Sequence, residues 1–308
     1  MSEDSKFKIG IVGCGRVGST IAYTLLLDGT ATDLVLFGRD CDKVNGEKLD
    51  LEHGLGVLDF VNLKATGNYE DLKECGIIII SAGVAQKPGE TRLDLFKTNK
   101  AIVEEIITQL NRVAPNAIIL MVTNPLDPLV FAANKISPNS RGRIFGTGTF
   151  LDTLRLRYYI GEKIKIDPKS IHAYILGEHG DSSFPVFANA TIGEQKLLEF
   201  PGVTKEFIDE AYAHTRNSAA ELIKLKGATY YGIAIAVSKF IQAILSNSKT
   251  VMPASVVLHG EYGLENVALS VPCVIGGKGV EKVLEIDLSE EEAAKLKESA
   301  TKLKEYDI

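Results

Sequence analysis

The sequence of 308 residues contains no tryptophan, only four cysteines and only five histidines. The cysteines (Cys14, Cys41, Cys75 and Cys273) lie far apart without a C-x-x-C pair, and no H-E-x-x-H motif occurs. A disulfide framework and a zinc site are therefore not expected, and the thiols are those of a protein in a reducing compartment.

Long apolar runs and clusters of basic residues are also missing. No apolar stretch approaches the ~20 residues that cross a bilayer, and the start of the chain, residues 1–6, is polar and acidic, unlike a secretory signal. The net charge is −6, from 34 basic and 40 acidic residues. We therefore expect a cytoplasmic protein with neither a membrane nor a nucleic-acid partner, acting on a small molecule.

Hydrophobic residues, at 45% of the chain, are abundant enough for a compact globular protein of about two domains. The first half alternates strands with helices. Its apolar strands show no inside–outside alternation, which is typical of a parallel sheet covered on both faces. The pattern predicts a doubly wound α/β domain with strands at residues 8–12, 33–37, 76–81 and 117–123 and helices at 16–27, 92–111 and 126–134.

The pattern changes after about residue 146, which predicts domains at 1–146 and 147–308. The second half suggests an α+β domain that ends in two strands and a helix from Ser289. Before these we expect helices near 150–160, 205–224 and 230–245 and strands near 170–176 and 184–192.

A glycine motif follows the first predicted strand and opens the first predicted helix. Residues 13–18 read G-C-G-R-V-G and match G-x-G-x-x-G. In this context the motif indicates a dinucleotide-binding Rossmann domain. Gly13 would form the tight turn, Gly15 would let backbone approach a pyrophosphate, and Gly18 would permit close helix–strand contact. Arg16 and Val17 complete the cofactor segment.

The end of the second strand bears on the choice of cofactor. NAD-binding domains usually place a carboxylate here to bind the ribose 2′-hydroxyl, whereas this chain has Gly38-Arg39-Asp40. Gly38 removes a carboxylate that would repel a 2′-phosphate, and Arg39 supplies a cation. We therefore predict a preference for NADP(H). NAD(H) remains possible if Arg39 points to solvent and Asp40 binds the ribose.

Four further segments resemble the lactate/malate dehydrogenase family, and together with the glycine motif they span nearly the whole chain. They are A-G-V-A-Q-K-P-G-E-T-R at 82–92, V-T-N-P at 122–125, L-D-T-L-R at 151–155 and G-E-H-G-D at 177–181, with K-G-A-T-Y-Y-G at 226–232. Gln86 in particular resembles the bacterial lactate-specific branch. The resemblance implies reversible hydride transfer between a nicotinamide cofactor and pyruvate or L-lactate, with no metal.

The reduction of a 2-oxo acid needs a proton donor, a cation at the carbonyl and an anchor for the carboxylate. His179 suits the proton relay because imidazole titrates near neutrality. By resemblance, Asp152 orients His179 and Arg155 binds the substrate carboxylate. Asp152 and Arg155 are three residues apart on a predicted helix and can face one cleft, although such a spacing also suits an ordinary surface ion pair.

Residues 82–92 contain glycine and proline and predict a mobile lid. The lid would bring Arg92 to the carbonyl after substrate binds, although Arg92 could instead simply begin a helix. The resemblance places Gly83 at the cofactor and Asn124 at both cofactor and substrate. Thr229 would form a small wall beside the substrate methyl group.

Charge counting in the closed pocket addresses substrate choice. Arg155 balances one carboxylate, so oxaloacetate would need a second cation on the lid. Malate dehydrogenases resemble this chain but carry arginine where it has the neutral Gln86. We therefore expect pyruvate, with Lys87 facing outward.

A second site is suggested by Arg157 and His172. Arg157 lies about 200° around the helix from Arg155, and His172 is an odd number of residues before His179, so both should point away from the catalytic cleft. They match the residues that bind fructose 1,6-bisphosphate between subunits in allosteric bacterial members of the family. This implies an activator and a homo-oligomer, typically a tetramer; two exposed basic residues would be the alternative.

Three other functions compete with this interpretation. An NADP-using malate dehydrogenase is the nearest, since the Gly38-Arg39 pair resembles that branch as well. A metal-dependent, NAD-dependent glycosidase would need a Cys–His arrangement that the sequence does not suggest. A non-catalytic nucleotide sensor would have lost part of the proton or carboxylate apparatus, whereas every matched position remains chemically competent.

Overall fold

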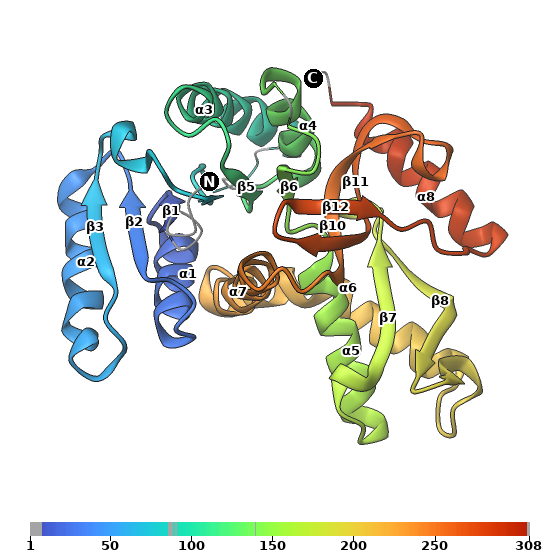
Figure 1. The fold of residues 1–308 in the computed structure, drawn as a ribbon. Helices are drawn as coiled ribbons and strands as arrows, with labels where there is room; N and C mark the ends of the chain where they lie inside the picture. Colours follow the sequence, from blue (N-terminus) through green and yellow to red (C-terminus); the bar gives the residue numbers. More distant parts are fainter. Residues whose placement is uncertain (1–7, 86–88, 90, 139, 307–308) are drawn as a thin grey trace.

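A computed structural model describes residues 8–85, 89, 91–138 and 140–306. Its backbone is a nine-stranded sheet with helices on both faces, and a smaller three-stranded sheet lies to one side (Figure 1). The strand order of the large sheet is β12-β11-β10-β6-β5-β4-β1-β2-β3. Its parallel strands are β1 (Lys8–Val12), β2 (Asp33–Phe37), β3 (Asn62–Thr66), β4 (Ile77–Ile80), β5 (Ile118–Met121) and β6 (Ile144–Gly146).

The large sheet continues past its parallel part into antiparallel strands from the second half of the chain. Strand β10 meets β6 at Ser255 and Gly146 and continues the sheet into β11 and β12. The smaller sheet is antiparallel in the order β7-β8-β9. These strands are β10 (Thr250–His259), β11 (Glu265–Gly276), β12 (Gly279–Val283), β7 (Ile171–Leu176), β8 (Phe184–Ile192) and β9 (Gln195–Lys196).

The parallel strands have apolar side chains on both faces because two separate cores enclose them. Ile77 and Ile79 of β4 belong to one core, which includes α1 and α7, whereas Ile78 and Ile80 belong to the other, which includes α3 and α4. This explains the continuous apolar runs in the sequence. The helices are α1 (Arg16–Leu27), α2 (Cys41–Gly54), α3 (Arg92–Val113), α4 (Leu126–Ile136), α5 (Phe150–Ile164), α6 (Lys205–Lys226), α7 (Tyr231–Leu245) and α8 (Glu290–Leu303).

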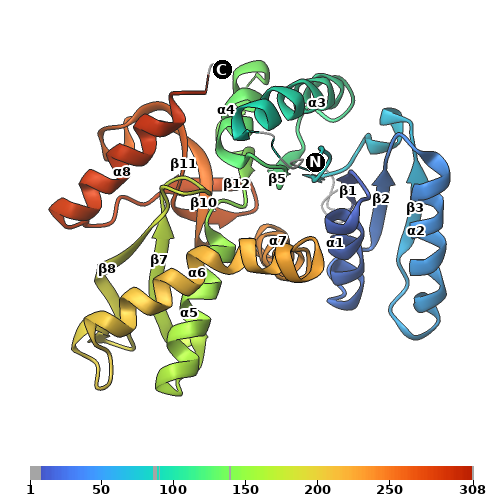
Figure 2. The same ribbon diagram turned by 180° about the vertical axis from the view of Figure 1, so that it is seen from behind.

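Capping residues set the starts of the helices that frame the site. Thr91 and Asp94 form a reciprocal capping box at the start of α3, which fixes Arg92 as its first residue. Ser289 and Glu292 form the same motif at α8. Helices α5 and α6 extend with β7 and β8 into a lobe below the sheet, which is also visible from behind (Figure 2).

The predicted fold class is confirmed: a parallel, doubly wound nucleotide-binding sheet is followed by a second α/β domain. The division at residues 146 and 147 stays a prediction. The chain ends with three strands before α8 rather than the expected two, because Gly276 and Gly279 allow a tight turn that adds β12. The predicted strands missed β3 and β6, which are short and only partly apolar or interrupted by glycine.

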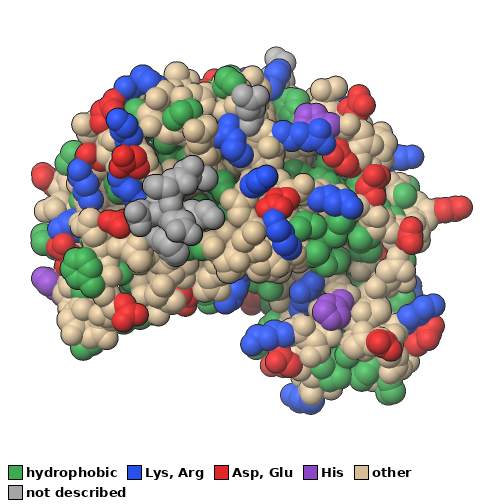
Figure 3. Space-filling view, viewed as in Figure 1, with side chains coloured by type: hydrophobic (Ala, Val, Ile, Leu, Met, Phe, Trp, Pro, Cys, Tyr) green, Lys and Arg blue, Asp and Glu red, His purple; other side chains and the backbone are tan. Residues whose placement is uncertain are grey.

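The surface is consistent with the mixed charge of the sequence. Basic and acidic side chains are interspersed over the face shown in Figure 3. Within the described part of the chain, every helix is too short or too polar to cross a membrane.

Candidate active site

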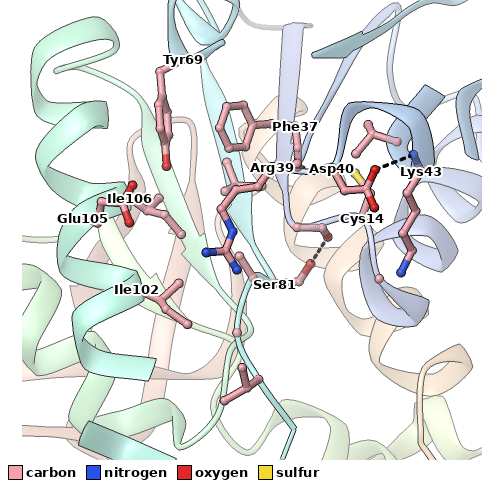
Figure 4. A pocket seen from close by; sticks show the side chains of 18 residues that line it. Cys14, Phe37, Arg39, Asp40, Lys43, Tyr69, Ser81, Ile102, Glu105 and Ile106 are labelled. Carbon is pink, nitrogen blue, oxygen red and sulfur yellow. Dashed lines mark hydrogen bonds between the residues drawn. The ribbon is translucent and has the colours of Figure 1, made fainter. Parts of the chain in front are cut away.

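A first cavity of about 330 Å³ lies at the carboxyl ends of β1, β2 and β4, where the strand order reverses (Figure 4). Doubly wound sheets bind their ligands at this position. Gly13, which lines the cavity, has φ +100°, and a Cβ here would lie 2.5 Å from the backbone nitrogen of Ala82. A Cβ at Gly18 would lie 1.9 Å from the oxygen of Gly13, so both glycines are needed for the turn itself.

Gly15 differs from the other two glycines of the motif. It is the N-cap of α1 without a side-chain capping bond, it lines the cavity, and a Cβ on it would meet nothing within 4 Å. The start of α1 therefore faces an open part of the cavity that no side chain at residue 15 fills. This arrangement fits a dinucleotide pyrophosphate, which needs close backbone donors and the positive end of a helix.

Arg16 and Val17, the two other residues predicted at the cofactor in this motif, lie outside the described lining of this cavity. Val17 packs into the core. Arg16 is exposed, and its guanidinium lies 3.5 Å from where a Cβ of Gly227 would be, next to the connection between α6 and α7. Arg16 therefore links the nucleotide-binding loop to the second half of the chain.

Gly38, Arg39 and Asp40 all line the first cavity. The side chain of Arg39 extends into it (Figure 4). Asp40 is the N-cap of α2, where its Oδ1 accepts a hydrogen bond of 3.1 Å from the backbone N–H of Lys43. Behind Gly38, a Cβ would lie 2.5 Å from Cγ2 of Val44, so a larger residue here requires Val44 to move.

A buried amide holds the loops after β4 and β5 together. Asn99 of α3 is fully buried; its Oδ1 accepts from Val84 N–H at 2.8 Å, and its Nδ2 donates to the oxygen of Asn124 at 2.7 Å. Gly83 lines the first cavity, and Asn124, which precedes a cis proline, lines the second. Asn99 thus connects one residue from each cavity, and the roles of Gly83 at the cofactor and of Asn124 at cofactor and substrate stay predictions.

A second cavity, of about 260 Å³, brings together Arg92, Asn124, Asp152 and His179 from four distant segments of the chain. The imidazole Nδ1 of His179 lies 2.9 Å from Oδ2 of Asp152. Burial alone would lower the pKa of His179, but the charge and hydrogen bond of Asp152 outweigh it and raise that pKa above its ordinary value. Nε2 of the ring is thereby left for a substrate.

Asp152 also bonds Arg155, whose NH1 donates to Asp152 Oδ1 at 3.0 Å. The two side chains are only 16% and 13% exposed, so this is not an ordinary surface ion pair. Burial would raise the pKa of Asp152, but His179 and Arg155 together hold it below its ordinary range. The carboxylate therefore stays ionised between an imidazole and a guanidinium.

Arg92, the first residue of α3, lines the same cavity and is paired with two carboxylates of the His179 loop. Its NH1 lies 3.7 Å from Glu178 Oε1, and its NH2 lies 3.3 Å from Asp181 Oδ1. The absence of a side chain at Gly180 makes room, since a Cβ there would lie 2.6 Å from NH1 of Arg92. In this conformation Arg92 is held beside the cavity by the loop that carries His179.

Of the residues expected at the substrate, Thr229 is not brought to the described cavity around His179. Thr229 lies half-buried in the connection between α6 and α7, outside the described lining of the cavity. Gln86, on which the substrate prediction depends, lies outside the described residues, as does Lys87.

Sequence reasoning missed the contribution of α6 and of α4. Tyr212 and Arg216 of α6 line the cavity around His179, and the guanidinium of Arg216 lies 5.9 Å from the centroid of the Tyr212 ring. Helix α6 carries no motif that marks these side chains. Asp127 of α4 is buried behind His179; its only signal was a carboxylate directly after the T-N-P turn.

The residues of the suggested effector site lie next to each other in the small lobe. Arg157 of α5 donates through Nε to the oxygen of Ala173 at 3.0 Å, and its guanidinium lies over the ring of Tyr174 at 5.2 Å. Burial lowers the pKa of Arg157. His172, on β7, is exposed. Neither belongs to the described lining of the cavity around His179, and Arg157 is packed against β7 rather than freely exposed.

Comparisons with known proteins agree with this geometry. Residues 7–146 match the family model of the lactate/malate dehydrogenase NAD binding domain, and residues 149–306 match that of the lactate/malate dehydrogenase alpha/beta C-terminal domain. An L-lactate dehydrogenase of Clostridium botulinum (strain Hall) is 42% identical over 302 residues, 96% of this chain and 95% of that protein.

Solved structures are similar over the whole chain as well. A lactate dehydrogenase from a Medee basin deep-sea metagenome library has a TM-score of 0.93 and 39% identity, covering 97% of both chains. The minor L-lactate dehydrogenase of Enterococcus mundtii, in a ligand-bound form, has a TM-score of 0.94 and 36% identity, covering 98% of both chains. The chain belongs to the lactate/malate dehydrogenase family.

Proposed function

We propose that this chain is an L-lactate dehydrogenase that interconverts pyruvate and L-lactate with a nicotinamide cofactor. The observation that carries the proposal is the buried Arg155–Asp152–His179 chain of contacts, with bonds of 3.0 and 2.9 Å. Asp152 and His179 line a cavity together with Arg92, and Arg155, outside the described lining, bonds Asp152. The names of the relatives point to the same reaction. A reduced nicotinamide, when bound, supplies the hydride.

The residues of this chain supply the other parts of the reaction. Protonated His179 donates a proton to the carbonyl oxygen of pyruvate as that oxygen becomes a hydroxyl, and Asp152 stabilises the imidazolium beforehand. The guanidinium of Arg92 moves away from Glu178 and Asp181 and polarises the carbonyl of the substrate. Arg155 binds the substrate carboxylate with its guanidinium while one edge stays on Asp152. In lactate oxidation neutral His179 takes the proton back.

Malate dehydrogenase is the second candidate because of one observation. Arg216 lines the cavity beside His179 and is a cation that the charge count from the sequence did not include. A guanidinium there would offer a partner to the second carboxylate of oxaloacetate. The neutral Gln86 favours pyruvate, and replacement of Gln86 by arginine should shift preference toward oxaloacetate.

We propose NADP(H) as the preferred form of the cofactor. The support is Arg39 in the cavity, no carboxylate at Gly38, and an Asp40 whose Oδ1 already caps α2. A ribose 2′-phosphate would find the cation of Arg39 at the end of β2, in a cavity whose lining also includes the carboxylates of Asp40 and Glu105, whereas NAD(H) would lack the usual ribose partner at residue 38.

We further propose that fructose 1,6-bisphosphate activates the enzyme through Arg157 and His172 in a homo-oligomer, with a tetramer as the expected form. The two residues lie on adjacent elements, since Arg157 bonds the neighbour of His172. To bind a phosphate, the guanidinium of Arg157 would either move off the ring of Tyr174 or bind the phosphate while it stays over that ring.

One matrix of initial rates tests these proposals together. Pyruvate and oxaloacetate are each assayed with NADH and with NADPH, with and without fructose 1,6-bisphosphate, in the wild type and the Gln86→Arg variant. The proposal expects the highest kcat/KM for pyruvate with NADPH and a lower KM for pyruvate with the bisphosphate. A wild type that reduces oxaloacetate faster than pyruvate would favour malate dehydrogenase instead.

A further inference from the structure

Asp127, in the first turn of α4, is a buried carboxylate that the reaction described above does not use. It is only 1% exposed, and its two oxygens have different partners. Oδ2 accepts a hydrogen bond of 2.6 Å from the backbone N–H of His179, and Oδ1 accepts one of 2.6 Å from the hydroxyl of Ser255. Asp127 therefore joins three elements: α4, the buried strand β10 and the loop that carries the proton donor.

The contacts identify the ionised form of this carboxylate. In both hydrogen bonds the oxygen of Asp127 is the acceptor: one donor is the N–H of His179 and the other is the O–H of Ser255. An ionised carboxylate only accepts hydrogen bonds, which fits these contacts. Burial raises the pKa of Asp127 to about 6, against the opposing effects of Ser255 and His179. The group is thus mostly charged at neutral pH. Among the described residues no lysine or arginine is recorded as hydrogen-bonded to it, so its charge is not cancelled by a direct ion pair, although Lys304 lines the neighbouring cavity.

We propose that Asp127 is a positioning residue for proton transfer: it fixes the main chain of His179 and, through its charge, favours the imidazolium over the neutral ring. Asp152 would hold Nδ1 from one side while Asp127 acts from behind through the backbone bond. Two carboxylates would then favour the protonated form of His179, which gives its proton to a keto acid. This inference rests on the proposed function.

Other charged groups around His179 cannot replace that effect. Arg155 opposes protonation of His179 and is already bonded to Asp152. Glu178 and Asp181 are turned to Arg92. Among the described residues, the remaining titratable groups that line the cavity around His179 or the one beside Asp127 are Tyr212 and Arg216 on α6 and Lys304 and Tyr306 near the C-terminus. Within the part of the chain that the structure describes, the carboxylates that hydrogen-bond His179 are Asp152 at the ring and Asp127 at the main chain.

The test compares Asp127→Asn with a matched control. Asparagine keeps the shape and can still accept from the His179 N–H, but it removes the charge. Glu292→Gln is the control, because Glu292 is also a buried carboxylate that accepts backbone N–H bonds, from Phe187 and Ala188, yet it lies away from His179. Ser255→Ala is a second probe, since loss of its hydroxyl raises the pKa of Asp127 while leaving the carboxylate in place.

Two readouts separate this inference from the activity itself. The first is the pKa of His179 measured by NMR in the full-length protein with ¹³C-labelled histidine, with the resonance assigned by its absence in His179→Gln. The second is the pH profile of kcat/KM for pyruvate reduction, which needs protonated His179, and for lactate oxidation, which needs the neutral ring. The NMR titration remains valid even if pyruvate is not the substrate.

Asp127→Asn should lower the His179 pKa by roughly one unit and move the basic limb of pyruvate reduction to lower pH by the same amount. Ser255→Ala should give a smaller shift in the same direction, and Glu292→Gln none. The inference is overturned if Asp127→Asn is folded but titrates like the wild type. If that variant does not fold, an unshifted Ser255→Ala overturns it equally.

Discussion

Removal of the Arg39 side chain should separate the two forms of the cofactor. An arginine–phosphate hydrogen-bonded pair contributes about 1.5–3 kcal/mol. Arg39 lines the cavity but is exposed, so water screens it and the lower part of that range, about 1.5–2 kcal/mol, applies here. Because every 1.4 kcal/mol is a factor of ten, Arg39→Ala should lower kcat/KM for NADPH by about 10–30-fold. The value for NADH should change little, since a 2′-hydroxyl makes no ion pair.

The assay is the initial rate of pyruvate reduction at varied NADPH and NADH, followed by cofactor fluorescence, which is free of indole background because the chain has no tryptophan. Arg39→Lys keeps the charge without the planar fork and should fall between wild type and alanine. Gly38→Asp, combined with Val44→Ala to relieve the 2.5 Å contact, should reverse the preference, with Gly38→Ala as the steric control. Equal losses with both cofactors in Arg39→Ala, or a wild type that prefers NADH, would refute the reasoning.

Three further predictions concern the glycine loop, the substrate anchor and the thiols. Gly15→Ala should leave the melting temperature unchanged yet weaken cofactor binding, whereas Gly18→Ala should lower the melting temperature. Of these two positions, residue 18 is the one where a Cβ would meet protein atoms. Equal melting temperatures of the two variants would contradict this. Arg155→Lys should raise the KM for pyruvate by roughly 10–100-fold, since lysine cannot make the two-pronged bond, and an unchanged KM would exclude Arg155 as the anchor. Burial raises the pKa of the Cys14 and Cys75 thiols to about 12, and burial raises the pKa of the Cys273 thiol further above its ordinary value. Ellman's reagent should therefore titrate only the exposed Cys41 in the native protein and all four thiols after unfolding, and fast reaction of a second native thiol would contradict the burial.

Local signals were sufficient where the chemistry depends on neighbours in the sequence. The glycine motif gave the start of α1 at Arg16, and the apolar patterns gave the other helices except α2, which has few apolar residues. The pairing of His179 with Asp152, 27 residues apart, followed from the family resemblance, and the structure brings their side chains to 2.9 Å.

Contacts that depend on tertiary packing could not be predicted from local patterns in the sequence. Arg216 lies on a helix with no marked motif, and its position in the cavity depends on how α6 crosses the lobe. Asp127 and Ser255 are 128 residues apart, and only the antiparallel extension of the sheet brings β10 beside α4. The alternative that Arg157 is simply an exposed basic residue also depended on tertiary packing. The sequence near Arg157 does not show that its side chain bonds the main chain of β7.

The central claim is that the imidazole of His179, held by Asp152, transfers the proton. Replacement of His179 by glutamine keeps a polar side chain of similar reach but removes the titrating group. The account predicts that kcat for pyruvate reduction falls by roughly 10²–10⁴-fold at neutral pH while cofactor binding is retained. A His179→Gln enzyme that turns over pyruvate at the wild-type rate would contradict it.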